Sequence, residues 1–412
     1  MMRTRCLTGL LAGALLSAAV GPSQAANCQI QPFERWLDGV RQEAAGQGVS
    51  PSALAALNGL AFDPSIVRRD HGQGVFQQSF LQFSDRMAAG YRIQGGIAMI
   101  KRHADLFARI EKQYGVPAPV ITAFWALESD FGSNNGKYPI LRAVATLAYD
   151  CRRPQFFRTQ LIDALRIIQR GDLRASEMIG DWAGELGPLQ FTPSDYYKYA
   201  VDYDGDGRRD LIHSVPDLLA SGANFLVGLG WKGGEPWLQE VRVPTTMPWE
   251  EADLAITHPR SEWAAWGVRA AHGAALPSDA FAASLLLPMG RLGPAFLAYP
   301  NFAAYTEWNN SLIYSTTAGY LAARIAGSPP MRKPAGAVAQ LPFNEIKELQ
   351  QLLVRAGFDV GKVDGVMGQQ SRTAVKAMQV KYGLPADSWP TAELLARMRG
   401  GTAQAQPQAT VR

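Results

Sequence analysis

The chain is poor in charge, in cysteine and in long apolar runs, and each scarcity excludes a class of protein. Only 18% of the 412 residues are charged and 47% are apolar, which excludes an intrinsically disordered chain. The formal net charge of +4 lacks the clustered basic residues of a nucleic-acid-binding surface, so we expect no nucleic acid partner. No stretch after the N-terminus reaches the roughly 20 apolar residues of a transmembrane helix. The length favours two or three folded domains.

The N-terminus has the features of an export signal. Arg3 and Arg5 precede an apolar run over 7–20, and small residues end the segment at about residue 26. This order predicts a signal peptide over residues 1–26 and a soluble periplasmic location. A buried N-terminal helix is the alternative.

Only three cysteines are present, and Cys6 lies within the predicted signal peptide. Cys28 and Cys151 would remain in the exported chain, where an oxidising compartment favours one disulfide between them. Two buried thiols are the alternative. Asn27 precedes Cys28, where a lipoprotein cleavage site requires a small residue, so we expect no lipid anchor.

Apolar periodicity predicts a mainly α-helical main domain over 27–327. Up to about residue 200, apolar residues recur at the three- and four-residue spacing of amphipathic helices. Pro117 and Pro119 separate two of these helices, and the second places Glu128 near its C-terminal end. Between 231 and 294 the segments EVRVP and SLLLP predict short strands in a small mixed α/β lobe. Helix returns at SLIYSTTAGYLAARIAG.

A segment rich in Pro, Ala and Gly then indicates a domain boundary. We predict a linker over 328–341, a small three-helix domain over 342–400 and a disordered tail over 401–412. Two amphipathic helices of this domain are marked by Leu349, Leu352 and Leu353 and by Ala374, Val375, Met378 and Gln379.

Glu128 is the first candidate catalytic residue. It directly follows Trp125, Ala126 and Leu127, so we expect its carboxyl to face a partly apolar pocket. Desolvation raises the pKa of a carboxyl because it disfavours the charged form. Such a Glu can hold a proton near neutral pH and give it to a departing glycosidic oxygen. A surface Glu at a helix end fits the same residues.

The segment DWAGELGPLQFTPS is a second candidate element. Gly184, Gly187 and Pro188 indicate a turn, and glycines let a backbone approach a ligand closely. The amide of Gln190 can both donate hydrogen bonds to a sugar and accept them from it. A plain loop between helices is the alternative.

The segment VDYDGDGRRDLIHSVPD has alternating carboxylates ahead of a glycine, the pattern of a loop that wraps calcium with oxygen ligands. Asp210 would supply a direct or water-bridged ligand. Position twelve is His213 instead of Glu, so Asp217 is the better closing ligand and the loop would be longer than an EF-hand. We predict a structural calcium ion, with an acidic solvated turn as the alternative. The predicted ligands are Asp202, Asp204, Asp206, the carbonyl of Arg208, and Asp217.

Taken together, these segments resemble the lytic murein transglycosylase B family. ALESDFG with Glu128, AGELGPLQFTPS with Gln190 and NFAAYTEWNNSLIYSTTAGYLA with Asn309 and Tyr314 occur in this order, with the acidic loop between the second and third. The resemblance implies a lysozyme-like fold that cleaves the β-1,4 bond between N-acetylmuramic acid and N-acetylglucosamine. It also implies that Glu128 is the only catalytic carboxylate and that Gln190, Asn309 and Tyr314 contact the glycan.

The chain departs from the family pattern at several of these positions. Asp181 stands where the family often has Ser, and Trp308 stands where it has Tyr. Pro188 and Leu189 replace a more usual pair of an aromatic and a small residue. We place Asp181 and Trp308 among the substrate-binding residues, although the substitutions leave their contacts open.

The reaction that the resemblance implies needs only one acid. Glu128 would protonate the leaving oxygen and then accept the proton of the muramic 6-hydroxyl, which attacks the anomeric carbon, assisted by the 2-acetamido group, to give 1,6-anhydromuramic acid. An ordinary glycosidase uses two carboxyls. If Asp130 or Asp181 activated water, the protein would be a hydrolytic muramidase. A non-catalytic cell-wall-binding protein is the other alternative.

The C-terminal segment resembles the peptidoglycan-binding domain 1 family through LQQLLVRAGF, VDGVMGQQSRTAVKAMQ and KYGLPAD. The resemblance implies that Asp364 and Gly365 shape a turn and that Gln379 lies on the second helix. Such a domain would hold the enzyme on the wall and raise the local substrate concentration. A helical appendage without a ligand is the alternative. We expect a monomer whose partner is peptidoglycan.

Overall fold

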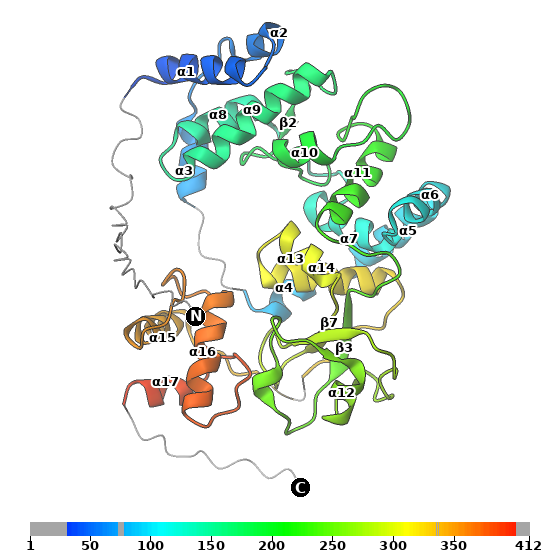
Figure 1. Cartoon of the computed structure of the whole chain (residues 1–412), viewed down its shortest axis with the longest axis vertical. Helices are drawn as coiled ribbons and strands as arrows, with labels where there is room; N and C mark the ends of the chain where they lie inside the picture. The colour runs from blue at the N-terminus through cyan, green and yellow to red at the C-terminus, as the bar shows by residue number, and fades with distance from the viewer. Residues whose placement is uncertain (1–30, 73–77, 335, 337, 401–412) are drawn as a thin grey trace, which may run out of the picture.

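The structure is a computed structural model that describes residues 31–72, 78–334, 336 and 338–400 (Figure 1). The predicted signal peptide, the predicted tail and Cys28 lie outside the described residues. Cys151 is disulfide-bonded. Its pairing with Cys28 stays a prediction, because Cys28 lies outside the described residues. Within the described ranges, no helix has both the length and the apolar character needed to cross a bilayer.

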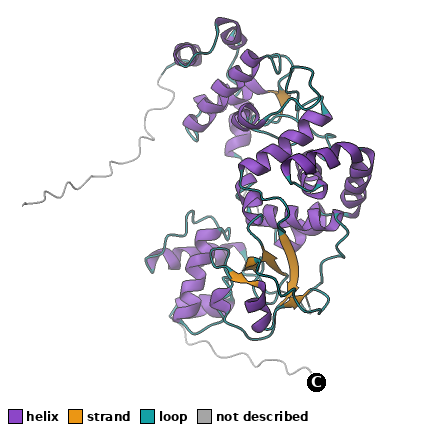
Figure 2. Cartoon of the chain, turned by 45° about the vertical axis from the view of Figure 1, so that its right-hand side comes forward, coloured by secondary structure: helices purple, strands orange, loops and turns teal. Residues whose placement is uncertain are grey.

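The main domain is built mostly of helices, as the periodicity predicts. Figure 2 shows helices through most of the chain and the longer strands gathered in one lobe. Its helices are α1 Phe33–Gly46, α2 Pro51–Leu54, η1 Ala55–Leu57, α3 Pro64–His71, α4 Phe80–Met87, α5 Gly90–Arg102, α6 Ala104–Tyr114, α7 Ala118–Ser129, α8 Ile140–Tyr149, α9 Pro154–Arg170, α10 Pro193–Tyr199, α11 Val215–Gly228, η2 Trp249–Glu251, α12 Arg260–Ala265, α13 Phe302–Trp308 and α14 Leu312–Ile325.

Helix α7 forms the centre of the main core. Ten of its twelve residues are buried, and it packs against α5, α6, α11 and α14. A helix that is apolar on every side is stable only when other elements surround it. Pro117 precedes it with extended backbone, and it ends where Asp130 adopts a left-handed conformation with φ 49°. Glu128 therefore lies in its last turn, as the sequence predicts.

The predicted mixed lobe contains an antiparallel five-stranded sheet in the order β4-β6-β7-β3-β5. The EVRVP and SLLLP segments overlap β3 and β6, which confirms both strand predictions. Trp249, Trp263 and Leu297 are among the buried side chains of the lobe's own core. The strands are β3 Leu238–Arg242, β4 His258–Pro259, β5 Arg269–Ala270, β6 Ala282–Leu286 and β7 Ala295–Ala298, while β1 Tyr138–Pro139 and β2 Ile179–Gly180 form a separate pair.

The C-terminal module contains three helices with a core of their own, as predicted. They are α15 Phe343–Arg355, α16 Gln369–Lys381 and α17 Ala392–Met398, and their core includes Leu349, Leu353, Val375 and Met378. In the turn between α15 and α16, Gly365 adopts φ +80°, and Asp364 Oδ1 accepts a hydrogen bond from Val366 N over 2.9 Å. Both residues shape this turn.

The module docks on the sheet lobe (Figure 1). The guanidinium of Arg372 on α16 is buried and donates to Leu287 O over 2.5 Å and to Pro288 O over 3.3 Å. Lys376 Nζ lies 3.2 Å from Asp253 Oδ2. These contacts fix α16 against residues at the end of β6.

The segment that we predict as a linker has neither helix nor strand in its described residues. Its backbone is nevertheless held against both domains. Met331 N donates to Tyr320 OH over 3.0 Å, Arg332 N donates to Glu240 Oε1 over 2.8 Å, and Trp389 Nε1 donates to Ala339 O over 3.0 Å. The connection is therefore bound along the surface of the protein.

Candidate active site

The carboxyl of Glu128 is held by two donors from the opposite side of the site. Trp308 Nε1, at the end of α13, donates to Glu128 Oε1 over 3.1 Å, and the hydroxyl of Tyr314, in the first turn of α14, donates to the same oxygen. Ser311 caps α14 and so orients its first turn. Both donors bind Oε1, which leaves Oε2 free of protein hydrogen bonds within the described part of the chain.

Burial raises the pKa of Glu128 from its ordinary value of 4.5 to about 7. The hydrogen bonds from Tyr314 and Trp308 oppose this rise because they stabilise the carboxylate, whereas the negative charge of Asp181 adds to it. A carboxyl with a pKa near 7 can both donate and accept a proton at neutral pH. This agrees with the environment that Trp125, Ala126 and Leu127 predict.

An aromatic cluster positions Trp308. Its ring stacks on Phe124 of α7 with centroids 4.1 Å apart and lies 4.9 Å from the ring of Phe225 on α11. Phe191 contacts it edge-on at 5.9 Å. Aromatic contacts of this kind orient a ring as well as burying it. Trp308, which we predict as a substrate contact, is thus also a fixed hydrogen-bond donor to the carboxyl of Glu128.

A tight turn places Gln190 beside Glu128. The hydroxyl of Ser129 donates to Pro188 O over 2.7 Å, which ties the end of α7 to this turn. Gln190 has a left-handed backbone with φ 49°, and its Nε2 donates to Gly187 O over 2.7 Å. Its Oε1 remains free to accept a hydrogen bond from a ligand.

Asp181 has a local role in this turn. Its Oδ1 accepts hydrogen bonds from Ala183 N over 2.8 Å and from Glu185 N over 3.0 Å. Two backbone donors therefore hold the carboxylate against its own turn, and Asp181 is absent from the described residues that line the cavity next to Glu128. A direct contact between Asp181 and substrate stays a prediction.

A cavity of about 300 Å³ opens beside Glu128, and we call it the Glu128 cavity. Trp308 at the end of α13 and Asn309, which follows it, line the cavity, and Asn309 Oδ1 accepts from Ser311 N over 2.9 Å. The cavity is lined by Glu128, Glu185, Leu189, Gln190, Phe191, Thr192, Asp195, Lys198, Tyr199, Phe225, Leu229, Glu307, Trp308 and Asn309.

A wider groove of about 850 Å³ shares Glu307 and Asn309 with the Glu128 cavity. Tyr314 lies in its wall, and residues 366–369 of the C-terminal module line it as well. The groove is therefore formed jointly by the main domain and the docked module. Four of the predicted substrate-binding residues line one or both of these hollows: Gln190, Trp308, Asn309 and Tyr314.

Glu185 is a residue of the cavity that the sequence analysis missed. Its pKa is raised from 4.5 to about 8, chiefly by burial and then by the charges of Asp181 and Glu128. At neutral pH this carboxyl is therefore mostly protonated. In the sequence it is one Glu within AGELG, and only the packing of that turn against α7 shows that it shares a cavity with Glu128.

Asp130 is engaged in an ion pair. Arg92 Nε lies 2.6 Å from Asp130 Oδ1 and Arg92 Nη2 lies 3.0 Å from Oδ2, so one guanidinium occupies both oxygens. Tyr91 OH donates to Oδ1 over 3.3 Å. A carboxylate bound in this way is a poor base for water, which removes support for hydrolysis through Asp130.

The acidic loop brings together three of the predicted calcium ligands. Carboxylate oxygens of Asp202, Asp204 and Asp217 lie within 4.8 Å of one another. Asp217, the predicted closing ligand, is fully buried at the start of α11 and accepts hydrogen bonds from Tyr203 N over 2.7 Å and Asp210 N over 2.8 Å. Several hard carboxylate oxygens around one point suit calcium, so the residues fit this ion.

The other predicted ligands have different contacts. The Asp206 side chain is exposed, and its Oδ1 accepts from Arg208 N over 2.8 Å, outside the group of three carboxylates. The guanidinium of Arg208 donates to Asp172 O over 2.8 Å and Asp210 pairs with His213. Ligation by Asp206 and by the carbonyl of Arg208 stays a prediction.

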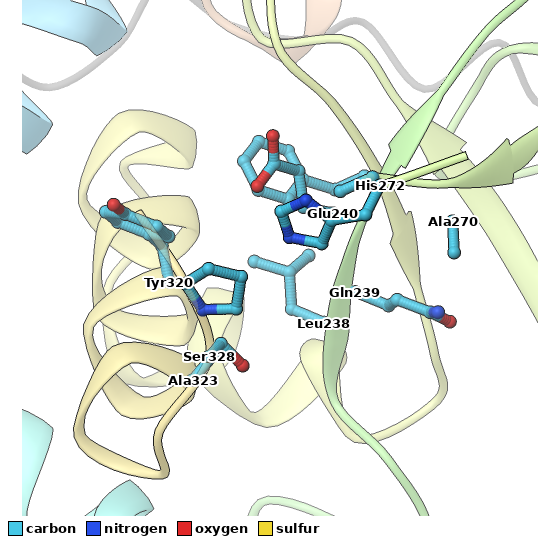
Figure 3. A pocket seen from close by; sticks show the side chains of 11 residues that line it. Leu238, Gln239, Glu240, Ala270, His272, Tyr320, Ala323 and Ser328 are labelled. Atoms are coloured by element: carbon cyan, nitrogen blue, oxygen red, sulfur yellow. The ribbon is translucent and has the colours of Figure 1, made fainter. Parts of the chain in front are cut away.

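A further cavity of about 220 Å³ lies between β3, β5 and the end of α14 (Figure 3). Figure 3 shows the carboxylate of Glu240 and the imidazole of His272 over an apolar floor that includes Leu238. Glu240 Oε1 accepts from Arg332 N over 2.8 Å, which ties it to the linker segment. We assign the active site to the Glu128 cavity because the carboxyl of Glu128, held by Trp308 and Tyr314, lines it and has a pKa raised to about 7.

Comparisons with known proteins identify the families of both domains. Residues 32–323 match the family model described as Transglycosylase SLT domain, which covers most of the chain. Residues 344–398 match the model described as Putative peptidoglycan binding domain. The two matches correspond to the main domain and the docked module.

The chain is similar to three proteins of known name. The chain is 28% identical over 249 residues to membrane-bound lytic murein transglycosylase B of Escherichia coli K12, covering 60% of this chain and 68% of that protein. It is 41% identical to SltB3 of Pseudomonas aeruginosa in complex with NAG-anhNAM-pentapeptide, with a TM-score of 0.82 and coverage of 90% and 100%. It is 26% identical to the Escherichia coli lytic transglycosylase Slt35 in complex with calcium, with a TM-score of 0.61 and coverage of 74% and 94%. The chain belongs to the lytic transglycosylase family that the SLT domain defines.

Proposed function

We propose that the protein cleaves peptidoglycan between N-acetylmuramic acid and N-acetylglucosamine with Glu128 as its single acid and base. The observation that supports this most is the buried carboxyl of Glu128, held by Trp308 and Tyr314 at the edge of a cavity large enough for a sugar. SltB3, which is 41% identical, binds NAG-anhNAM-pentapeptide, a fragment with an anhydro end.

In the first step Glu128 donates its proton to the glycosidic oxygen. The bond between the anomeric carbon and that oxygen breaks, and the leaving sugar departs with a hydroxyl group. In the second step the 6-hydroxyl of the muramic sugar attacks the anomeric carbon, and the carboxylate of Glu128 takes the hydroxyl proton. The bonds from Trp308 and Tyr314 stabilise that carboxylate between the two steps. One residue is thus regenerated in its starting form.

The rival hydrolytic reaction needs a second carboxylate to activate water. Asp130 is held by Arg92, and Asp181 is held by two backbone N–H groups. Glu185 shares the cavity, but its pKa of about 8 keeps it protonated at neutral pH, so it cannot accept a proton from water there. These contacts favour transglycosylation.

The wider groove would bind the rest of the glycan strand. It continues from the Glu128 cavity to residues 366–369 of the C-terminal module, so one strand would contact both domains. The module would then hold the wall next to the catalytic residue as well as anchoring the protein. We further propose export to the periplasm through residues 1–26 and a structural calcium ion bound by Asp202, Asp204 and Asp217, as Slt35 in complex with calcium suggests.

Purified sacculi test the proposed function. The wild-type protein should release soluble fragments that end in 1,6-anhydromuramic acid, detected by mass spectrometry as a mass deficit of one water relative to reducing ends. Reducing ends would establish hydrolysis instead. Binding without any release would leave a wall-binding protein.

A further inference from the structure

The Glu128 cavity carries an excess of acids. Four carboxyls line it, from Glu128, Glu185, Asp195 and Glu307, and Lys198 is the only Lys or Arg in its described lining. Glu307 is exposed, and Asp195 accepts from the hydroxyl of Thr192 over 2.6 Å. Because the pKa values of Glu128 and Glu185 are raised, to about 7 and about 8, this cavity can present protonated carboxyls to a ligand.

Among these four, Glu185 is half-buried and has no protein partner for its carboxyl. Across the described ranges, no hydrogen bond or ion pair involves Glu185 Oε1 or Oε2, whereas Glu128 has Trp308 and Tyr314. A half-buried carboxyl without a protein partner takes its hydrogen bonds from water or from a ligand. The carboxyl therefore has free hydrogen-bonding capacity at the wall of the substrate cavity.

The backbone around Glu185 is rigidly held. Glu185 N donates to Asp181 Oδ1 over 3.0 Å, and Asp181 N donates to Glu185 O over 3.0 Å, which closes the turn from both sides. A side chain at Gly180 would lie 1.9 Å from Glu185 O, so glycine is required for this close approach. The turn therefore fixes the backbone position of Glu185, whose side chain lines the cavity.

The surroundings of Glu185 decide its protonation. Burial and the negative charges of Asp181, Glu128 and Asp195 all raise its pKa, and Arg153 opposes them, with a result of about 8. Lys198 and Glu307 face the same cavity from α10 and α13, and Tyr314 of α14 interacts electrostatically with Glu185. Below pH 8 the carboxyl is a neutral acid with an O–H group to donate, the state in which a buried acid serves as a hydrogen-bond donor in catalysis.

We propose that Glu185 binds substrate by donating a hydrogen bond, as a neutral carboxylic acid, to an uncharged oxygen of an N-acetylated sugar in the Glu128 cavity. This inference rests on the proposed function, because it takes the cavity as the glycan site. The acceptor is a carbonyl or hydroxyl oxygen, the uncharged acceptors that an N-acetylated sugar offers. Glu185 is thus a substrate-binding residue beside Glu128, with no proton transfer of its own.

The test measures binding without turnover. In a Glu128→Gln background, the tetrasaccharide of N-acetylglucosamine is titrated and its binding is measured by isothermal titration calorimetry. The parent is compared with versions that also carry Glu185→Gln, Glu185→Ala or, as a distant control on α1, Glu34→Gln. The Gln side chain keeps an N–H donor but cannot ionise.

At pH 6 we expect Glu185→Gln to bind like the parent and Glu185→Ala to bind about tenfold more weakly, the effect of losing one hydrogen bond. As the pH rises, the parent loses affinity as Glu185 ionises, while Glu185→Gln keeps it. The transition in this background falls at lower pH than in the wild type, because Glu128 no longer adds its charge.

Three outcomes overturn the inference. They are parent-like binding by Glu185→Ala, a Glu185→Gln variant as weak as Glu185→Ala, or an affinity of the parent that does not change with pH. If Glu185→Ala does not fold, as its melting curve would show, the pH comparison of parent and Glu185→Gln still decides. Wild-type digestion of sacculi separates the two proposals. If anhydro ends appear but the Glu185 results fail, only this inference is lost, whereas the absence of release ends the proposed function itself.

Discussion

The indole N–H of Trp308 donates a hydrogen bond to Glu128 Oε1 over 3.1 Å and joins two residues that lie 180 positions apart in the sequence. The same oxygen accepts the hydroxyl of Tyr314. Glu128 therefore titrates in an environment set by two opposing influences, since burial raises its pKa and the two donors lower it. The balance places the pKa at about 7, where one carboxyl can act first as an acid and then as a base.

Replacing Trp308 by Phe should move the pH profile. The Phe ring keeps the stacking on Phe124 but removes the donor that stabilises the carboxylate, so the pKa of Glu128 rises. Because the first step needs protonated Glu128, the alkaline limb of kcat/KM should shift to higher pH in Trp308→Phe. Anhydro-product release, measured across pH 5 to 9, checks this. An unchanged or acid-shifted limb would contradict the role of Trp308, and Trp36→Phe on α1 is the control.

Glu128→Gln should abolish turnover while leaving the fold intact. Loss of a general acid or base costs about 100-fold to 10,000-fold for each proton transfer, and here one residue carries both. Release of anhydro fragments should therefore fall by several orders of magnitude, while binding to sacculi is retained. Substantial residual release would sink the assignment of Glu128.

The same variant should change the pH dependence of stability. The pKa of Glu128 is about 7 in the folded protein and 4.5 in its ordinary environment, so its stabilising contribution is complete below pH 4.5 and is lost as the pH rises through 7. The Gln side chain of Glu128→Gln does not ionise, so this variant does not lose stability as the pH rises. It should unfold like the wild type at pH 4 but be more stable at pH 8, by at most about 3 kcal/mol. Denaturant titrations at both pH values check this, and equal stability at pH 8 would argue that the carboxyl is well solvated.

Much of the fold could be predicted from the sequence because its signals are local. The apolar run of α7 and the alternating carboxylates of the acidic loop each lie within a few consecutive residues. Two of the five lobe strands, β3 and β6, are predicted from short apolar runs among Gly and Pro residues. These features need no knowledge of what packs against them.

The missed features depend on contacts between distant segments. Glu185 has no distinguishing feature in the sequence, and only the folded structure places it in the cavity with Glu128. Asp130 is a candidate base in the sequence, and only the structure shows its ion pair with Arg92, 38 residues earlier. Arg372 gives no sign in the sequence that it contacts Leu287, 85 residues away. Composition predicts a linker over 328–341 but cannot show which backbone N–H groups of that segment are held by partners.

Calcium should stabilise the protein through the acidic loop. An ion that binds only the folded state adds about 2.7 kcal/mol at a concentration 100 times its Kd. The melting temperature of the wild type should therefore rise on going from chelator to calcium, and Asp204→Ala should abolish this rise because Asp204 belongs to the group of three carboxylates. Asp206→Ala should keep most of the rise if Asp206 is not a ligand. Identical wild-type curves with calcium and with chelator would exclude the site, and Asp38→Ala on α1 is the control.

Arg372→Ala should release the C-terminal module from the sheet lobe. The buried guanidinium serves the carbonyls of Leu287 and Pro288, and each carbonyl left without a donor costs about 1–3 kcal/mol. Because the module has its own core, it should stay folded while it detaches, so the radius of gyration measured by X-ray scattering should increase and residues 328–341 should become sensitive to proteases. Arg355→Ala, an exposed Arg of α15, is the matched control.

The kinetic consequence of Arg372→Ala distinguishes two roles of the module. If residues 366–369 line the glycan groove, detachment removes one wall, and KM for long soluble glycan strands should rise while kcat, which depends on Glu128, changes little. If the module is only a tether, KM for soluble strands should stay the same and only the activity on intact sacculi should fall. Unchanged scattering, proteolysis and kinetics together would show that Arg372 does not hold the two domains in contact, and the shared groove would then need another explanation.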